Sequence, residues 1–161
     1  MRNSVTLKTI AEYNFTAMVF SPGPGVPSQA GIMPALIHNY HTKIPLLGIC
    51  LGHQGIGEYF GATLARAQKP MHGKLSEIIH DNDPIFNGIP DKIKVVRYHS
   101  LLLKNMPPSL QIISQTAENE VMIFKHRTHP CYGIQFHPEA YLTEFGIDLL
   151  RNWVNLYQLS G

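Results

Sequence analysis

The residues best suited to nucleophilic chemistry gather around Cys50. This cysteine lies where the apolar run of residues 44–49 meets a segment with helical spacing, and Gly48 and Gly52 flank it. In a Gly-x-nucleophile-x-Gly turn the nucleophile is strained, and both flanking positions must be small. A helix N-terminus behind the sulfur favours the reactive thiolate, and the amide of Leu51 is placed to donate to an oxyanion. The alternative is a buried structural cysteine, since free cysteine packs as a small hydrophobe. α/β-Hydrolases and several cysteine enzymes share such a turn.

A second chemical signal follows the last predicted strand. His137-Pro138-Glu139 places a base and a carboxylate two residues apart, where a strand ends at Phe136. A carboxylate at this spacing can orient the base that activates a nucleophile. Taken alone, the tripeptide is more typical of a surface turn with a solvated glutamate.

A third signal is the loop of residues 21–25, Ser-Pro-Gly-Pro-Gly. Two prolines and two glycines form a rigid turn whose backbone N–H groups can point at a ligand. Most stretches of this composition are only turns, so the loop gains meaning from the other two signals.

The elements that must position these residues alternate between strand and helix in the first half of the chain. The pattern predicts strands at 16–20 and 44–49, helices over 31–40 and from Cys50 to a cap at Gly61, and a closing helix at 143–157. Shorter strands are predicted at 75–80, 93–98, 110–116, 121–126 and 131–136. This order predicts an α/β fold with a parallel sheet covered on both faces and an antiparallel extension.

Bulk properties exclude several classes of protein. The 161 residues suit one domain, here residues 1–161, and a net charge of +2 with scattered Lys and Arg predicts no nucleic-acid stripe. No apolar run is long enough for a membrane span, and residues 1–6 lack the core of a signal peptide. Two cysteines fit a reducing, cytoplasmic compartment. No second ligand pair accompanies Cys50 and His53 at zinc spacing, so we expect no metal and a packing or hydrogen-bonding role for His53.

Taken together, the three signals resemble the class I glutamine amidotransferases. The resemblance rests on residues 21–25, on residues 48–54 (Gly-Ile-Cys-Leu-Gly-His-Gln) and on residues 135–139 (Gln-Phe-His-Pro-Glu). It implies a flavodoxin-like fold and a triad of Cys50, His137 and Glu139 that hydrolyses L-glutamine. It further implies an oxyanion site at the amides of Gly25 and Leu51.

Two more segments narrow the resemblance to the small subunits of anthranilate and aminodeoxychorismate synthases. They are Met-His-Gly-Lys at residues 71–74 and Arg-Tyr-His-Ser-Leu at residues 97–101, the latter interpreted as a strand end. The resemblance implies a larger, chorismate-binding partner subunit that receives ammonia and uses Mg²⁺, with no cofactor on this chain. His72 and Lys74 are expected to face that partner. The glutamine site implied by the resemblance comprises Gly23, Pro24, Gly25, Gln54, Ser100 and Leu101.

One departure from the family and two alternatives remain. Relatives begin with a strand, which lies inside the sheet, and a helix. Residues 2–13 correspond to the stretch after the second strand of those relatives, so we expect a domain incomplete at its N-terminus. The first alternative is a remnant that only binds a partner. The second is an amidotransferase of nucleotide or carbamoyl phosphate synthesis. Anthranilate and aminodeoxychorismate synthesis are not distinguished, because that choice lies in the partner.

Overall fold

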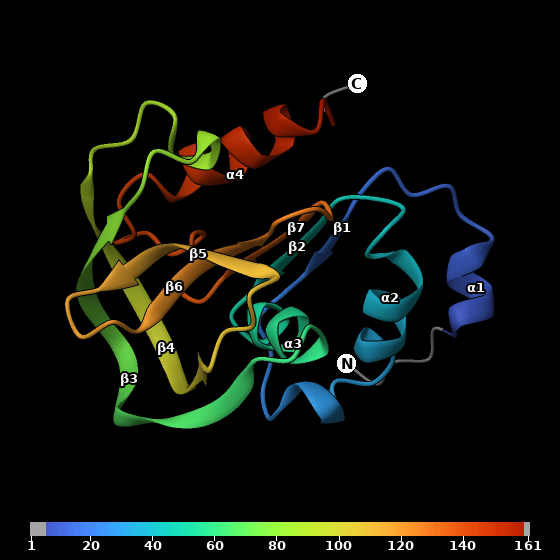
Figure 1. The fold of residues 1–161 in the computed structure, drawn as a ribbon, viewed down its shortest axis with the longest axis horizontal. Coiled ribbons are helices and arrows are strands. Elements are labelled where there is room, and N and C mark those ends of the chain that lie inside the picture. Colours follow the sequence, from blue (N-terminus) through green and yellow to red (C-terminus); the bar gives the residue numbers. More distant parts are fainter. Residues whose placement is uncertain (1–5, 160–161) are drawn as a thin grey trace.

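The computed structural model describes residues 6–159, and of residues 68–70 only the backbone. Within that range seven strands form one sheet in the order β1-β2-β7-β6-β5-β3-β4 (Figure 1). The strands are β1 (Met18–Phe20), β2 (Leu46–Ile49), β3 (Thr63–His80), β4 (Lys92–Lys104), β5 (Leu110–Thr116), β6 (Val121–His126) and β7 (Cys131–Ile134). The α-helices are α1 (Leu7–Ala11), α2 (Met33–Tyr40), α3 (Leu51–Tyr59) and α4 (Gly146–Leu156), with 3₁₀ turns at Pro27–Gln29 and Pro84–Phe86.

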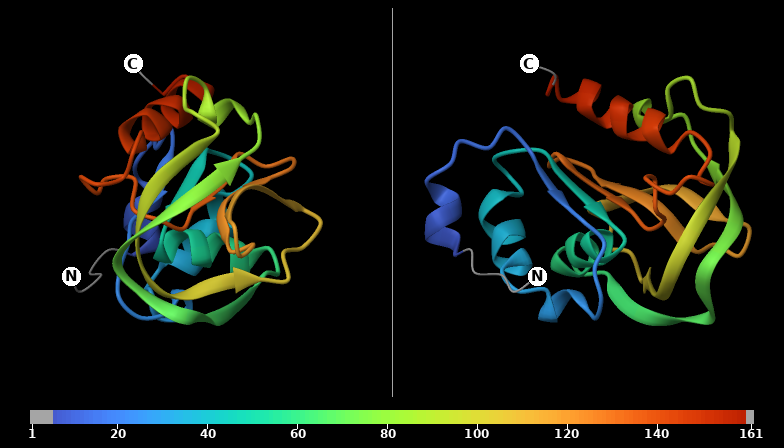
Figure 2. Two further views of the ribbon diagram at one scale, coloured as in Figure 1. Left: turned by 90° about the vertical axis from the view of Figure 1, so that its left-hand side faces the viewer. Right: turned by 180° about the vertical axis from the view of Figure 1, so that it is seen from behind.

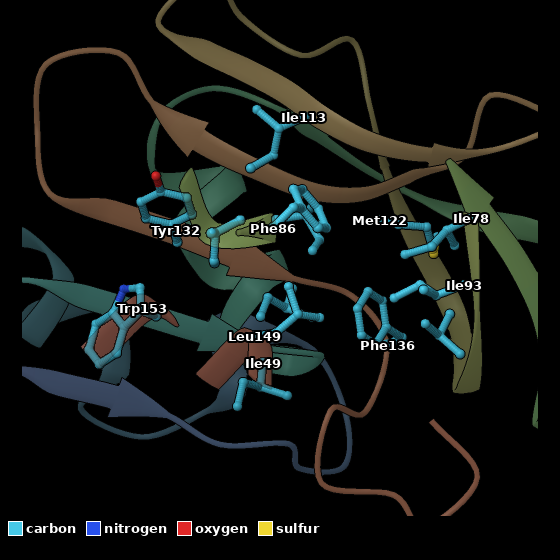
Figure 3. Packing of buried hydrophobic residues seen from close by; sticks show 14 of the residues in the cluster. Ile49, Ile78, Phe86, Ile93, Ile113, Met122, Tyr132, Phe136, Leu149 and Trp153 are labelled. Carbon is cyan, nitrogen blue, oxygen red and sulfur yellow. The ribbon is translucent and has the colours of Figure 1, made fainter. Parts of the chain in front are cut away.

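Helices cover both faces of the sheet. Helix α4 lies on one face and helices α2 and α3 on the other, as the rear view in Figure 2 shows. The strands are apolar on both sides, so adjacent residues enter different cores: Leu46 packs with α2 and α3, and Leu47 packs with Leu149 and Trp153 of α4. Figure 3 shows the α4 side, with Leu149 beside Ile49. This two-sided burial holds the end of β2, and hence Cys50, between two packed layers.

The sheet has the predicted mixed character. Strands β1, β2 and β7 are parallel, whereas β6, β5, β3 and β4 are joined by antiparallel pairings. The α/β prediction, with a parallel front half and an antiparallel extension, is therefore confirmed. No helix of residues 6–159 has the length and apolarity that a membrane crossing requires.

The predicted element boundaries are right for some strands and wrong for others. Strands β5 and β6 begin and end where predicted, whereas β3 and β4 are much longer and pair along most of their length. Residues 98–101 therefore lie inside β4, and the interpretation of this segment as a strand end is wrong. Residues 97–101 lie beside residues 71–74, because His72 of β3 pairs with Tyr98 of β4 next to a bulge at Gly73.

The end of the last strand and the beginning of the last helix also differ from the prediction. Strand β7 ends at Ile134 and α4 begins at Gly146, because Phe145 takes a left-handed conformation with φ of 56°. The residues between them form the irregular segment that carries His137 and Glu139. Near the N-terminus, residues 2–13 were matched to the stretch after the second strand of the relatives. Residues 2–5 of that stretch lie outside the described residues, and Leu7–Ala11 forms the short helix α1.

Candidate active site

Cys50 occupies a strained turn between β2 and α3. Its backbone has φ of 53° and ψ of −99°, an unfavourable region for a residue with a side chain. A Cβ on Gly48 would lie 2.3 Å from the carbonyl of Gly52, and a Cβ on Gly52 would lie 2.4 Å from the carbonyl oxygen of Phe20. Both glycines are therefore required by close backbone approach, as the motif predicts.

The residues predicted to bind glutamine line one pocket of about 190 Å³ beside this cysteine. The loop of residues 23–25 forms one wall, with Gly25 at φ of 82°, and the middle of β4 forms the other. Gln54 of α3 is attached to the β4 wall, because its amide donates to the carbonyl oxygen of Leu101 at 3.1 Å. The pocket is lined by Gly23, Pro24, Gly25, Cys50, Leu51, Gln54, Tyr98, His99, Ser100 and Leu101. Short polar walls made of backbone groups suit a small zwitterion.

His137 and Glu139 form a pair next to the pocket. The Nδ1 atom of His137 lies 2.7 Å from a carboxylate oxygen of Glu139, whose side chain is 51% exposed. The His137 backbone donates to the carbonyl of Val96 on β4 at 3.1 Å. Its Nε2 atom is buried and has no hydrogen-bond partner among the residues described. The ring thus presents one free nitrogen, as a base requires.

The sulfur of Cys50 bonds to neighbours other than His137. It donates to the carbonyl oxygen of Tyr98 at 4.0 Å and accepts from the side-chain amide of Gln135 at 3.8 Å. The ring of Tyr98 meets the ring of His137 edge to face, with centroids 5.3 Å apart. Tyr98 therefore lies in contact with both the cysteine and the histidine. Catalytic hydrogen bonds are commonly long or poorly aligned before substrate binds.

The expected thiolate is not the favoured form of Cys50 in this structure. Burial raises the pKa of the Cys50 thiol to about 11, the backbone N–H of Leu51 opposes that rise, and the charge of Glu139 adds to it. The helix N-terminus acts in the predicted direction through the Leu51 amide, but desolvation outweighs it and the neutral thiol is favoured.

Three residues around the sulfur were not assigned from the sequence: Tyr98, His99 and Gln135. His99 is buried, and its ring nitrogens meet the Nε of Arg97 and the carbonyl of Leu101, each at 2.9 Å. Burial and the Arg97 charge lower the pKa of His99 to about 4, so the imidazole is neutral. Its hydrogen bonds to Arg97 and Leu101 help to fix the pocket wall. The only signal for these residues was their place inside residues 97–101 and 135–139, two of the segments that carry the resemblance.

Three further histidines have structural surroundings. His53 is fully buried against Phe124, and burial lowers its pKa to about 3, so it is a neutral packing residue. His126 and His129 stack on each other beside Phe60, and Cys131 is buried. Across residues 6–159, no three His, Cys, Asp or Glu side chains are arranged to hold a metal ion.

Comparison with known proteins places the chain in a family. A family model described as glutamine amidotransferase class-I matches residues 1–156. The aminodeoxychorismate/anthranilate synthase component 2 of Bacillus subtilis is 41% identical over 97% of this chain and 81% of its own length. The bifunctional protein TrpGD of Thermotoga maritima is 38% identical over 98% of this chain, which spans only 27% of that longer protein.

A solved structure supports the same conclusion about the fold. A protein of Thermoplasma acidophilum, provisionally assigned to GMP synthase, superposes with a TM-score of 0.84 over 95% of this chain and 78% of its own, at 28% identity. The flavodoxin-like α/β fold implied by the resemblance is thereby confirmed. With the family model covering nearly all of its residues, this chain belongs to the class I glutamine amidotransferases.

Proposed function

We propose that this chain hydrolyses L-glutamine with Cys50, His137 and Glu139, and passes the ammonia to a chorismate-binding synthase subunit. The observation that carries the proposal is the strained Cys50 turn in the lining of a small pocket, with a Glu139-bound histidine that has a free ring nitrogen and lies against Tyr98 of the same pocket. A structural cysteine gains nothing from this conformation, whereas a nucleophile gains exposure to substrate.

The reaction follows from the positions of these groups. The Cys50 sulfur attacks the side-chain carbonyl carbon of glutamine while its proton passes to Nε2 of His137. The backbone amides of Leu51 and Gly25 receive the oxyanion, each worth about 3 kcal/mol by analogy with other oxyanion holes. His137 then protonates the departing nitrogen, and ammonia leaves. Water, deprotonated by His137, releases glutamate from the thioester, and Glu139 stabilises the imidazolium in both steps.

The relatives favour one class of partner. The Bacillus subtilis relative, at 41% identity, is named as a component of aminodeoxychorismate and anthranilate synthases, whereas the structure named for GMP synthesis is 28% identical. This difference favours a chorismate-binding partner over the nucleotide pathway. We place the partner against β3 and β4, where the exposed His72 pairs with Tyr98 of the pocket wall and the exposed Lys74 pairs with Arg97. Any Mg²⁺ requirement belongs to that partner, and its identity decides between the two products.

Glutamate release by the purified chain tests the proposal. The chain is assayed with glutamine alone, with a chorismate-binding synthase subunit, and with the ATP-dependent synthetase component of a GMP synthase, which is the competing partner. Cys50→Ala removes the nucleophile and Cys131→Ala is the matched control at the other buried cysteine. Cys50-dependent release that rises only with the chorismate-binding subunit is expected.

Other outcomes point to the alternatives. Activation by the GMP synthase component and not by the chorismate-binding subunit would mean that the chain supplies ammonia for nucleotide synthesis. A folded chain that binds the chorismate-binding subunit but releases no glutamate with any partner would be a partner-binding remnant, and the proposed activity would be wrong.

A further inference from the structure

We propose that Gln135 is a further catalytic residue, whose side-chain amide donates a hydrogen bond to the Cys50 sulfur and stabilises its thiolate. This inference rests on the proposed function only in taking Cys50 as the nucleophile. The Nε2 atom of Gln135 lies 3.8 Å from Sγ, within the range of hydrogen bonds to sulfur. Gln135 follows β7 and Cys50 follows β2, and these two strands are parallel neighbours in the sheet. The contact is thus set by the sheet itself.

The orientation of the Gln135 amide is fixed by its neighbours. The carbonyl oxygen of Leu101 can only accept, so the Gln54 group facing it at 3.1 Å must be the NH₂. The same Gln54 nitrogen lies 3.3 Å from Oε1 of Gln135, which must therefore be the acceptor. The NH₂ of Gln135 is left facing the sulfur. A reversed amide would set two donors against each other, so the donor reaches Cys50.

The surroundings make this donor useful. Gln135 is fully buried, and burying an amide without hydrogen-bond partners costs folding free energy. Its bonds to Gln54 and Cys50 offset that cost and fix the side chain in this position. Burial raises the pKa of the Cys50 thiol to about 11, which leaves the thiolate in need of donors. The titratable groups around the sulfur are His137 and Glu139 after β7 and Tyr98 and His99 on β4. Gln135 supplies a donor whose strength does not change with pH, because an amide does not titrate.

The arrangement also joins the substrate pocket to the nucleophile. Gln54 lines the pocket and donates to the carbonyl oxygen of Leu101 in the pocket wall. It also donates to Gln135 and polarises that amide, so the three residues form one chain of hydrogen bonds. Hydrogen bonds in series strengthen one another in a low-dielectric site. A substrate that tightens the Leu101 wall therefore also holds the donor against the sulfur.

The test measures how fast iodoacetamide alkylates Cys50 as a function of pH, with mass spectrometry of the Cys50 peptide to exclude Cys131. Gln135→Met removes the donor at similar length, and Gln135→Glu keeps an acceptor for Gln54 while replacing the NH₂. Gln111→Met and Gln111→Glu, on β5 outside the pocket, are the matched controls. We expect both Gln135 variants to raise the apparent thiol pKa by about one, so that alkylation near pH 7 slows about tenfold. The Gln111 variants keep the wild-type profile.

A second measurement uses the wild-type chain and needs no folded variant. The side-chain NH₂ signals of Gln135 are followed by ¹⁵N–¹H NMR while Cys50 is titrated and then alkylated. A Gln135 signal that moves with the Cys50 ionisation supports the bond. Wild-type alkylation profiles in both folded Gln135 variants, or a Gln135 signal indifferent to Cys50, would overturn it.

The two proposals can fail separately. Alkylation and NMR require neither glutamine nor a partner. A Gln135-dependent thiol in a chain that never releases glutamate would remove the proposed activity and leave this inference standing.

Discussion

The hydroxyl of Thr143 donates to the backbone carbonyl of His137 at 2.7 Å and accepts from the backbone N–H of Val96 at 3.1 Å. One side chain therefore ties the histidine segment to β4, which also forms the wall of the pocket. The neighbouring Glu144 repeats the attachment, since its carboxylate accepts from the N–H of Lys94 at 2.7 Å. The irregular segment after β7 thus follows β4 closely, and His137 is placed relative to Tyr98 by these bonds rather than by the sheet alone.

Thr143→Val should destabilise the fold and weaken catalysis together. Valine keeps the shape but leaves the buried N–H of Val96 unpaired, while the carbonyl of His137 keeps only its bond from the N–H of Ala140. The unpaired N–H costs about 1–3 kcal/mol of unfolding free energy. The freed histidine segment should lower the rate of glutamate release at saturating glutamine, with little change in KM, because Thr143 does not line the glutamine pocket. Urea unfolding and steady-state kinetics measure the two effects. Thr42→Val, at an exposed threonine, is the control, and equal behaviour of the two variants would refute the role.

Gly52→Ala should be far more damaging than Gly55→Ala, although both lie in the first turns of α3. The new methyl at residue 52 meets the backbone carbonyl of Phe20, which cannot move without breaking β1. We expect a loss of about 3 kcal/mol or more in unfolding free energy. At residue 55 the nearest atom is the tip of the Met33 side chain, at 2.6 Å, which can rotate away, and alanine favours the helix by up to about 1 kcal/mol. Denaturant unfolding of both variants decides, and equal stability would contradict the argument.

The parts predicted correctly from the sequence are those whose determinants are contiguous. The Cys50 turn could be predicted because the nucleophile and both glycines fall within five residues, and the clashes that require glycine are made within that turn and with the adjacent strand. Strands β5 and β6 were bounded correctly because turn residues separate them.

The parts that were missed depend on distant pairing. Strand β3 extends back to Thr63 only because β4 is there to pair with it, and nothing within residues 63–74 indicates that partner. The Gln135–Cys50 contact joins residues 85 apart in the sequence, so it exists only once β7 lies beside β2. Likewise the raised pKa of Cys50 follows from burial under two layers, which a turn motif does not encode.

Acid should destabilise the fold through its buried neutral histidines. The pKa of His53 falls from 6.5 to about 3 and that of His99 from 6.5 to about 4, in both cases chiefly through burial. Between these values and 6.5 the unfolded chain binds protons that the folded chain does not. Their contribution is therefore complete above pH 6.5 and is lost as the pH falls. At pH 5 the loss for His53 is about 2 kcal/mol.

Urea unfolding at pH 7.5 and pH 5 checks this dependence. His53→Gln removes one titrating group, so the variant should lose less stability than the wild type between the two pH values, whatever its stability at pH 7.5. His72→Gln, at an exposed histidine, should keep the full wild-type loss. If His53→Gln and the wild type lose equal amounts, His53 is not the source of the acid sensitivity.

Glu139→Gln should slow glutamate release without unfolding the protein. The carboxylate contacts Nδ1 of His137 at 2.7 Å and is half exposed, so its removal leaves no buried charge unpaired and costs little stability. Glutamine can still orient the imidazole but cannot stabilise the imidazolium that forms when His137 takes the Cys50 proton. We expect the maximal rate to fall roughly 10²-fold, in the lower part of the range for acid–base catalysis, with KM little changed. Steady-state assays with the activating partner present measure this, and Glu118→Gln, at an exposed glutamate outside the pocket, is the control. A Glu139→Gln variant as fast as the control would mean that His137 acts without a carboxylate partner, and the triad would reduce to a Cys50–His137 dyad.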